Sequence, residues 1–203
     1  MPARERTRVE QALEWLQSGE PGAVERSLAV LQDAVFGFGM KVCGNPADAE
    51  DTAQETLVRL ARSLKTFPNT RALSVWLYKV AKSQCLMSRR KSKFAPEHML
   101  SIDELMPPNG HDGEAGIKSW AVTPEEALLQ GEFRERLEKA IRALPPHYRL
   151  VLILRDMEQL DTREVAEVMG ISEDTVKMRL HRARVFVRNK LDKYLRRTPV
   201  QPE

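Results

Sequence analysis

The sequence contains little of what a secreted or membrane-spanning protein needs. Its 203 residues include two cysteines, Cys43 and Cys85, which are too few for a disulfide framework and indicate a reducing compartment. The first residues, Met-Pro-Ala-Arg-Glu-Arg, are not followed by the apolar segment of a signal peptide, and no uninterrupted apolar run approaches a membrane span. We therefore expect a cytoplasmic protein without direct membrane insertion.

Groups that catalyse reactions or bind metals are also scarce. Cys43, Cys85, His98 and His111 show no metal-ligand spacing, so we expect unliganded side chains. The carboxylates within residues 48–55 have no glycine-rich loop or third catalytic group beside them, so a helical enzyme is the least favoured interpretation. The sequence predicts no catalytic residue, no metal, no cofactor and no small-molecule substrate.

Charge is plentiful, but the two signs nearly balance. A hydrophobic fraction of 42% and a charged fraction of 30% are typical of folded, helix-rich proteins, and a net charge of +3 does not by itself indicate a nucleic-acid binder. The basic residues are concentrated, however. Residues 175–197 hold nine Lys or Arg against one acid, and residues 79–93 hold six and no acid. Two separate basic segments suggest two contacts with a polyanion.

The most informative segment runs from Asp161 to Arg188 and has the pattern of a helix-turn-helix. Apolar residues at helical spacing predict a short first helix, which Gly170 ends in the left-handed conformation. Ser172 is a suitable N-cap for the second helix. That helix combines an apolar stripe with a cationic exposed side, as a helix that reads the major groove requires. The alternative is an ordinary helical hairpin with a solvated basic face.

Four amphipathic helices are predicted before this segment, in a compact domain that spans residues 7–91. Their apolar positions recur at steps of three and four, and breaks rich in glycine or proline separate them. Phe36 and Phe38 are assigned to the core, whereas Tyr78 is expected to be more exposed by its period. We expect these helices at residues 7–17, 23–42, 48–64 and 72–90.

Residues 92–123 sustain no helical period and contain many prolines and glycines, so they are predicted to form a flexible linker. A second domain, residues 124–197, follows. A helix capped by Thr123 is predicted to run to Arg142, and another at 147–157. The sequence therefore predicts an all-α fold of two small helical domains joined by a flexible linker, the second ending in the helix-turn-helix.

Four stretches of the chain occur in an order that is specific to one family. They are Asp48-Ala-Glu-Asp-Thr-Ala-Gln-Glu55, Trp76-Leu-Tyr-Lys-Val-Ala81, Leu144-Pro-Pro-His-Tyr-Arg149 and Thr175-Val-Lys-Met-Arg-Leu-His-Arg-Ala-Arg184. They resemble, in that order, the region 2.2 signature, the region 2.3 to 2.4 segment, the start of region 4 and its recognition helix in sigma factors. The chain thus resembles an extracytoplasmic-function sigma factor, a small member of the sigma-70 class of bacterial RNA polymerase subunits.

The resemblance implies that one side of the helix at 48–64 docks on core RNA polymerase, at the β′ coiled-coil, with the β flap as a further polymerase contact. Carboxylates and an amide on one helical face suit a basic partner. Without the resemblance, helix capping and a solvated surface would explain the same face. The residues that match the docking face are Asp48, Asp51, Gln54 and Glu55.

The resemblance also implies two sets of promoter contacts. The loop before the fourth helix would form a pocket for a flipped base of the minus-ten element, and the basic segment after it would hold phosphates of the melted strand. The recognition helix would read the minus-thirty-five duplex. The minus-ten set is Asn69, Thr70, Arg71, Lys79, Lys82, Arg89 and Arg90. The minus-thirty-five set is Ser172, Thr175, Lys177, Met178, Arg179, His181 and Arg182.

The implied function is to bind core RNA polymerase and direct promoter-specific transcription initiation, without enzymatic activity. An anti-sigma factor that holds the protein inactive is the usual arrangement in the family. The alternative is a stand-alone helix-turn-helix regulator that binds duplex operators as a symmetric dimer. That alternative leaves the acidic face at 48–55 and the basic segment at 79–91 unexplained.

Overall fold

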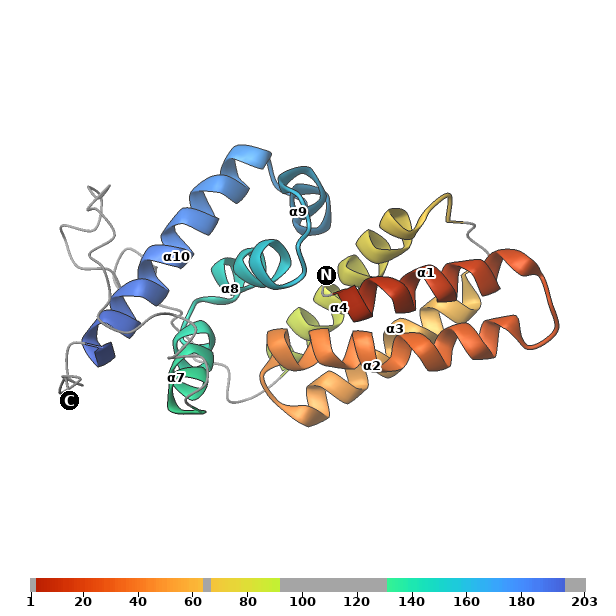
Figure 1. Ribbon diagram of the computed structural model, residues 1–203, viewed down its shortest axis with the longest axis horizontal. Coiled ribbons are helices and arrows are strands. Elements are labelled where there is room, and N and C mark those ends of the chain that lie inside the picture. The colour runs from red at the N-terminus through yellow and green to blue at the C-terminus, as the bar shows by residue number, and fades with distance from the viewer. Residues whose placement is uncertain (1–2, 64–66, 92–130, 196–203) are drawn as a thin grey trace, which may run out of the picture. The chain divides into compact units, whose positions relative to one another are not determined.

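All regular secondary structure in the described part of the chain is helical. The computed structural model describes residues 3–63, 67–91 and 131–195 (Figure 1). The predicted all-α fold is therefore confirmed over these ranges. The linker predicted at 92–123 lies outside them, and the domain limits 7–91 and 124–197 remain predictions.

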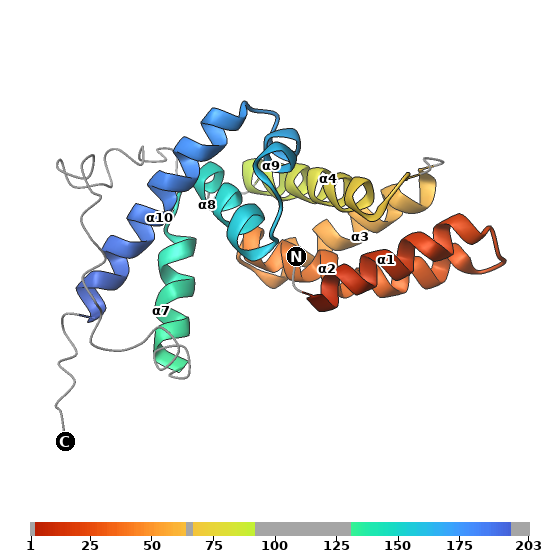
Figure 2. The same ribbon diagram turned by 45° about the horizontal axis from the view of Figure 1, so that its top comes forward.

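The described residues form two compact units. The first contains the residues up to 91 together with Ile153–Val176, and the second contains 131–152 and 177–195. The first unit begins with four helices, of which α2 contacts each of the other three (Figure 2). They are α1 (Ala3–Ser18), α2 (Ala23–Cys43), α3 (Pro46–Arg62) and α4 (Thr70–Lys91).

The local sequence explains how α2 gives way to α3. Gly44 ends α2 with a φ of 83°, which a residue without a Cβ adopts at little cost. Asn45 Oδ1 accepts a hydrogen bond from the Asp48 N–H at 2.8 Å, and Pro46 is the first helical residue, both favoured at a helix start. Gly39 allows close packing, because a Cβ there would lie 3.1 Å from Ala49 Cα. The start of α3 is therefore held firmly against α2.

The aromatic residues depart from two of the predictions. Phe38 is buried as predicted, but Phe36 on the same helix is 37% exposed. Tyr78 was predicted to be more exposed and is instead buried, with 8% of its surface accessible. Its ring lies 4.7 Å from that of Phe38. The period of a single helix predicts which face is apolar, but not which other segments cover it.

The two cysteines are paired, whereas the sequence predicts unpaired, reduced side chains. Cys43 at the end of α2 and Cys85 on α4 form a disulfide, with their Cα atoms 5.5 Å apart. Both cysteines are buried, and the Thr52 hydroxyl of α3 lies 3.6 Å from Cys43 Sγ and 3.5 Å from Cys85 Sγ. The pair therefore joins two helices at the point where they meet a third.

We expect reduction of this disulfide to destabilise the four-helix part of the chain. The bond spans a sequence separation of 42 residues, and closing a loop of that size in the unfolded state is worth about 4 kcal/mol in the chain-entropy account. Thermal unfolding with and without reductant measures the effect. In the Cys43→Ala/Cys85→Ala variant, reductant should change nothing. Two free thiols in the protein prepared without reductant would contradict the pairing.

The rest of the described chain is a series of shorter helices and one long one. The predicted helix at 147–157 is present, but its second half is a π-helix rather than an α-helix. In the last helix, Val176, Ala183 and Leu191 are buried. The elements are α7 (Gly131–Arg142), α8 (Pro146–Leu152), the π-helix η1 (Ile153–Met157), α9 (Thr162–Met169) and α10 (Glu173–Leu195).

The predicted turn between α9 and α10 is confirmed. Gly170 has a φ of 70°, and its N–H donates to the Ala166 carbonyl at 2.8 Å. Ser172 Oγ then accepts from the Thr175 N–H at 3.2 Å, which caps α10. These short-range bonds turn the chain sharply between the two helices. No helix within the described ranges is long and apolar enough to cross a bilayer.

Candidate nucleic-acid interface

The face of α3 that is predicted to dock on polymerase is exposed at three of its four positions. Asp51, Gln54 and Glu55 are exposed, and Asp48 is half-buried. Glu55 is paired with Arg59 at 2.8 Å, while Asp48 Oδ2 accepts from the Asn45 side chain. The carboxylates of Asp48 and Glu55 thus already have neighbours on their own element or its cap. Asp51 and Gln54 present polar groups to solvent at the centre of this face.

The residues predicted to hold a flipped base lie at the start of α4. Asn69 is exposed, and its Oδ1 accepts from the Ala72 N–H at 2.9 Å, so it caps the helix. Thr70 is half-buried. Arg71 is exposed but makes two ion pairs, with Asp161 and with Glu164, the latter at 2.6 Å between Nε and Oε1. Both acids belong to the start of α9, which lies beside α4.

The basic residues further along α4 differ in their surroundings. Lys79 is exposed, whereas Lys82 is half-buried and donates to the Val168 carbonyl at 2.6 Å. Burial lowers the pKa of Lys82 below its usual value of 10.5, and the nearby charge of Lys79 lowers that pKa further. Arg89 and Arg90 lie on α4, but their side chains are outside the described residues. The structure therefore describes one solvent-facing and one engaged lysine of the predicted set.

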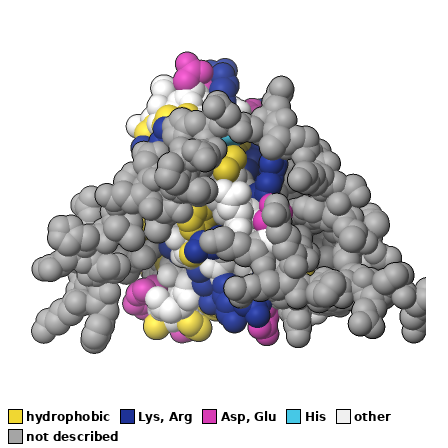
Figure 3. Space-filling view, turned by 90° about the vertical axis from the view of Figure 1, so that its left-hand side faces the viewer, with side chains coloured by type: hydrophobic (Ala, Val, Ile, Leu, Met, Phe, Trp, Pro, Cys, Tyr) yellow, Lys and Arg dark blue, Asp and Glu magenta, His cyan; other side chains and the backbone are white. Residues whose placement is uncertain are grey.

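The predicted minus-thirty-five residues lie along the exposed side of α10 and its cap. Ser172 and Thr175 are used in the cap, where their hydroxyl oxygens are 2.8 Å apart. Met178 is 43% exposed, which is high for a methionine in a folded protein. Lys177 and His181 are exposed, and Arg179 and Arg182 are half-buried. Lys and Arg side chains are prominent in the described part of the face shown in Figure 3.

The opposite side of α10 is apolar. Val176, Leu180 and Ala183 are buried and follow each other at steps of four and three. The helix thus keeps one side buried while its other side carries cations and Met178. This separation is what a helix needs in order to enter a DNA groove without losing its support.

A buried cluster in the first unit was missed by the sequence reasoning. Glu158, which follows η1, is 1% exposed, and its two carboxylate oxygens accept from Lys41 Nζ and Tyr78 Oη, each at 2.6 Å. The partners are 117 and 80 positions away in the chain. The sequence holds no local signal for such a cluster, because Glu158 lies in what reads as a short polar connection.

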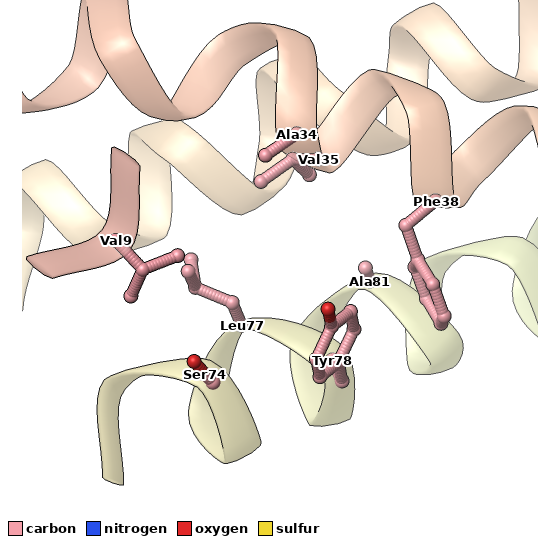
Figure 4. Close-up of a pocket in the computed structure, with 8 residues that line it drawn as sticks. All are labelled: Val9, Ala34, Val35, Phe38, Ser74, Leu77, Tyr78 and Ala81. Carbon is pink, nitrogen blue, oxygen red and sulfur yellow. The ribbon is translucent and has the colours of Figure 1, made fainter. Parts of the chain in front are cut away.

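A small pocket lies between α1, α2 and α4 (Figure 4). Six of its eight lining residues are apolar, and the polar exceptions are Ser74 and Tyr78. Its volume of about 20 Å³ is near that needed by a single water molecule. This pocket is too small for an organic ligand.

Comparison with known proteins identifies two sequence-family models that match the chain. The sequence model of sigma-70 region 2 matches residues 29–94, and the model of sigma-70 region 4 matches residues 134–187. The two ranges together cover more than half of the chain. They include α3, α4 and the helix-turn-helix, which carry the predicted sites.

Individual relatives match along most of their length. The chain is 28% identical over 183 residues to the ECF RNA polymerase sigma factor SigW of Bacillus subtilis, covering 90% of this chain and 96% of SigW. It is 27% identical over 190 residues to the RNA polymerase sigma-H factor of Pseudomonas aeruginosa, covering 92% and 95%. The fold is similar to that of the sigma factor RpoE from Bartonella quintana, solved with the anti-sigma factor NepR, with a TM-score of 0.58, 22% identity and coverage of 85% and 98%. The chain belongs to the sigma-70 family, as an extracytoplasmic-function sigma factor.

Proposed function

We propose that this chain binds core bacterial RNA polymerase and directs it to specific promoters. The observation that carries the proposal is the match of both sigma-70 regions, in order, to the parts of the chain that display the acidic face of α3 and the basic side of α10. Each part of the chain alone should bind DNA weakly. With both docked, the second DNA contact becomes effectively intramolecular and therefore much stronger.

The polymerase contact is assigned to the exposed side of α3. Asp51 and Gln54 present a carboxylate and an amide to solvent, which suits docking against a basic helical partner such as the β′ coiled-coil. The β flap is proposed as the polymerase element that holds the region 4 part of the chain. Docking two separate parts of one chain onto one large partner would set the spacing between the two promoter contacts.

One promoter contact is assigned to the start of α4 and to the basic residues along it. The other is assigned to α10. The minus-ten strand would be held in its melted form, with a base in the loop at Asn69–Arg71 and phosphates along Lys79 and Lys82. The minus-thirty-five duplex would be read by side chains of α10, such as Lys177 and Arg182. These assignments follow from exposure, charge and the matching positions of the family.

The remaining parts of the proposal concern setting and control. We place the protein in the cytoplasm, where RNA polymerase acts, and assign it no enzymatic activity. We further propose that an anti-sigma factor holds it inactive. Support comes from a relative of similar fold that was solved with an anti-sigma factor.

Binding to purified core polymerase distinguishes this proposal from a stand-alone dimeric regulator. We expect the chain to be a monomer that comigrates with core polymerase in size-exclusion chromatography. Selection of DNA fragments by the resulting complex should return two sequence elements at a constant spacing. A dimer that leaves the polymerase unbound and selects palindromic duplexes would contradict the proposal.

A further inference from the structure

The stretch of chain directly before α4 is attached to α1 by one side chain. Gln17, in the last turn of α1, donates from Nε2 to the Phe67 carbonyl at 2.9 Å, across 50 positions of sequence. Within the described ranges no other group donates to this carbonyl. The bond is partly shielded from water, so without Gln17 the carbonyl would lose its protein partner. The end of α1 thus fixes the point at which the chain approaches α4.

The end of α1 is itself held in one conformation. Ser18 Oγ donates to the Trp15 carbonyl at 2.8 Å and accepts from the Glu20 N–H at 3.2 Å. These bonds satisfy groups that the end of a helix leaves without a partner in the helix. Helix α1 also packs against α4. Gln17 therefore extends from a well-placed helix end, although its side chain is exposed.

The residues that follow the Gln17 contact have little conformational freedom of their own. The Phe67 ring is buried and lies 5.7 Å from the ring of Trp76, at an interplanar angle of 63°. Pro68 has a fixed φ and restricts the backbone of the residue before it. Asn69 Oδ1 accepts from the Ala72 N–H at 2.9 Å. The cap uses the oxygen of the Asn69 amide and leaves its Nδ2 as a hydrogen-bond donor.

An ordered backbone at this place matters for a pocket that receives a flipped base. A base that leaves the stack loses its stacking energy, and contacts in the pocket must replace it. A pocket that is already formed binds more tightly, because less entropy is lost in fixing the loop. Asn69 is the first residue assigned to the flipped base, two positions after the carbonyl that Gln17 holds. Loss of this hydrogen bond should therefore lower the affinity for the flipped base more than for the rest of the strand.

We propose that Gln17 is a positioning residue of the minus-ten pocket. Gln17 contacts no base in this proposal, and its hydrogen bond keeps the backbone before Asn69 in the conformation that receives the flipped base. The inference rests on the proposed function, because it assumes that residues 69–71 hold a base of the melted strand. It adds α1 to the elements that determine minus-ten recognition, which the sequence analysis placed in α4 and the loop before it.

Variants of the full-length chain test the inference. Gln17→Met removes the donor and keeps a side chain of similar length without a branch. Gln17→Lys keeps a donor on a flexible chain that can reach the same carbonyl. The matched controls are Gln11→Met and Gln11→Lys, which make the same changes at another exposed glutamine of α1. They control for the change in polarity and in charge.

The first measurement is the affinity of each protein, in complex with core polymerase, for a fluorescent single-stranded oligonucleotide. The oligonucleotide carries the minus-ten element selected by the wild-type complex, either intact or with one abasic position at a time. The abasic position that costs the wild type most marks the flipped base. Gln17→Met should reduce the ratio of intact to abasic affinity at that position about fivefold, equivalent to about 1 kcal/mol. Gln17→Lys should restore the ratio, because a new phosphate contact would strengthen both strands equally.

The second measurement is amide hydrogen exchange of the free chain at the start of α4. The Ala72 N–H is protected by the cap from Asn69, and the Leu73 N–H donates to the Asn69 carbonyl. Both amides should exchange faster in Gln17→Met than in Gln11→Met, because the stretch before them opens more often. Unchanged exchange at both amides would contradict the inference.

The binding outcomes separate the inference from the proposed function. The inference is wrong if Gln17→Met keeps the affinity ratio of Gln11→Met, or if Gln17→Lys behaves like Gln17→Met. It is also wrong if Gln17→Met weakens intact and abasic strands equally, since Gln17 would then support the fold rather than the pocket. In these cases the wild-type complex still depends on one base, so the proposed function stands. A wild-type complex that is insensitive to every abasic position would overturn the assignment of residues 69–71 to a flipped base, and this inference with it.

Discussion

Replacing Asp51 with alanine is expected to weaken binding to core polymerase by at least about 30-fold, equivalent to about 2 kcal/mol. Asp51 is exposed on α3, at the centre of the face that also carries Gln54. Its loss removes a carboxylate and leaves the basic group of the partner without its counter-charge in the interface. The effect can be measured by fluorescence anisotropy of the labelled chain titrated with core polymerase. Raising the salt concentration should reduce the difference in polymerase affinity between the wild type and Asp51→Ala.

The control for this experiment is Glu14→Ala, which removes an exposed carboxylate from α1 in the same unit. It should bind polymerase as the wild type does, because α1 is not part of the docking face. Thermal unfolding should be nearly the same for all three proteins, since exposed side chains away from caps contribute little stability. Equal polymerase affinities for Asp51→Ala and Glu14→Ala would show that α3 is not the docking helix.

The second large effect is expected on α10, where two basic residues should behave differently. Arg182→Ala should weaken binding to a preferred minus-thirty-five duplex by about 1–3 kcal/mol and relax the preference at one base pair, because a guanidinium can bind a guanine bidentately. Lys177→Ala should weaken binding to all duplexes by a similar factor. It should also reduce the slope of log affinity against log salt concentration by about one, because one phosphate contact is lost. Competition among base-substituted duplexes, in complexes with polymerase, distinguishes the two patterns.

Arg134→Ala is the matched control for the α10 variants. Arg134 is an exposed arginine on α7 and is paired with Glu138 on its own helix. It is not assigned to DNA, so both affinity and preference should remain unchanged. If Arg182→Ala lowers affinity for every duplex equally, Arg182 contacts the DNA backbone rather than a base. If neither variant differs from Arg134→Ala, α10 is not the helix that reads duplex DNA.

Local features were predictable because they depend on short stretches of sequence. The helices from Ala23 to Cys43 and from Pro46 to Arg62 lie within a few residues of the predicted limits, since glycine, asparagine and proline mark their ends. The same holds for Gly170, whose φ of 70° ends α9. The exposed basic side and buried stripe of α10 also follow from helical periodicity alone.

Features that depend on distant segments were not predictable in this way. Tyr78 is buried because Phe38 and Glu158, both far away in the chain, lie against it. The disulfide depends on α2 and α4 bringing Cys43 and Cys85 within reach, which no spacing in the sequence reveals. The engagement of Arg71 and Lys82 by α9 likewise requires a contact that links positions about 90 residues apart. Each depends on tertiary packing, and helical periodicity carries no information about it.

The central claim is that this chain gives RNA polymerase its choice of promoter. Core polymerase, with and without the purified chain, should be supplied with a library of genomic fragments, and the 5′ ends of the transcripts should be mapped. The account predicts new start sites that appear only with the chain, each preceded by the same two elements at one spacing, and their loss with Asp51→Ala. Start sites that are unchanged by the chain, although it binds duplex DNA by itself, would contradict the account.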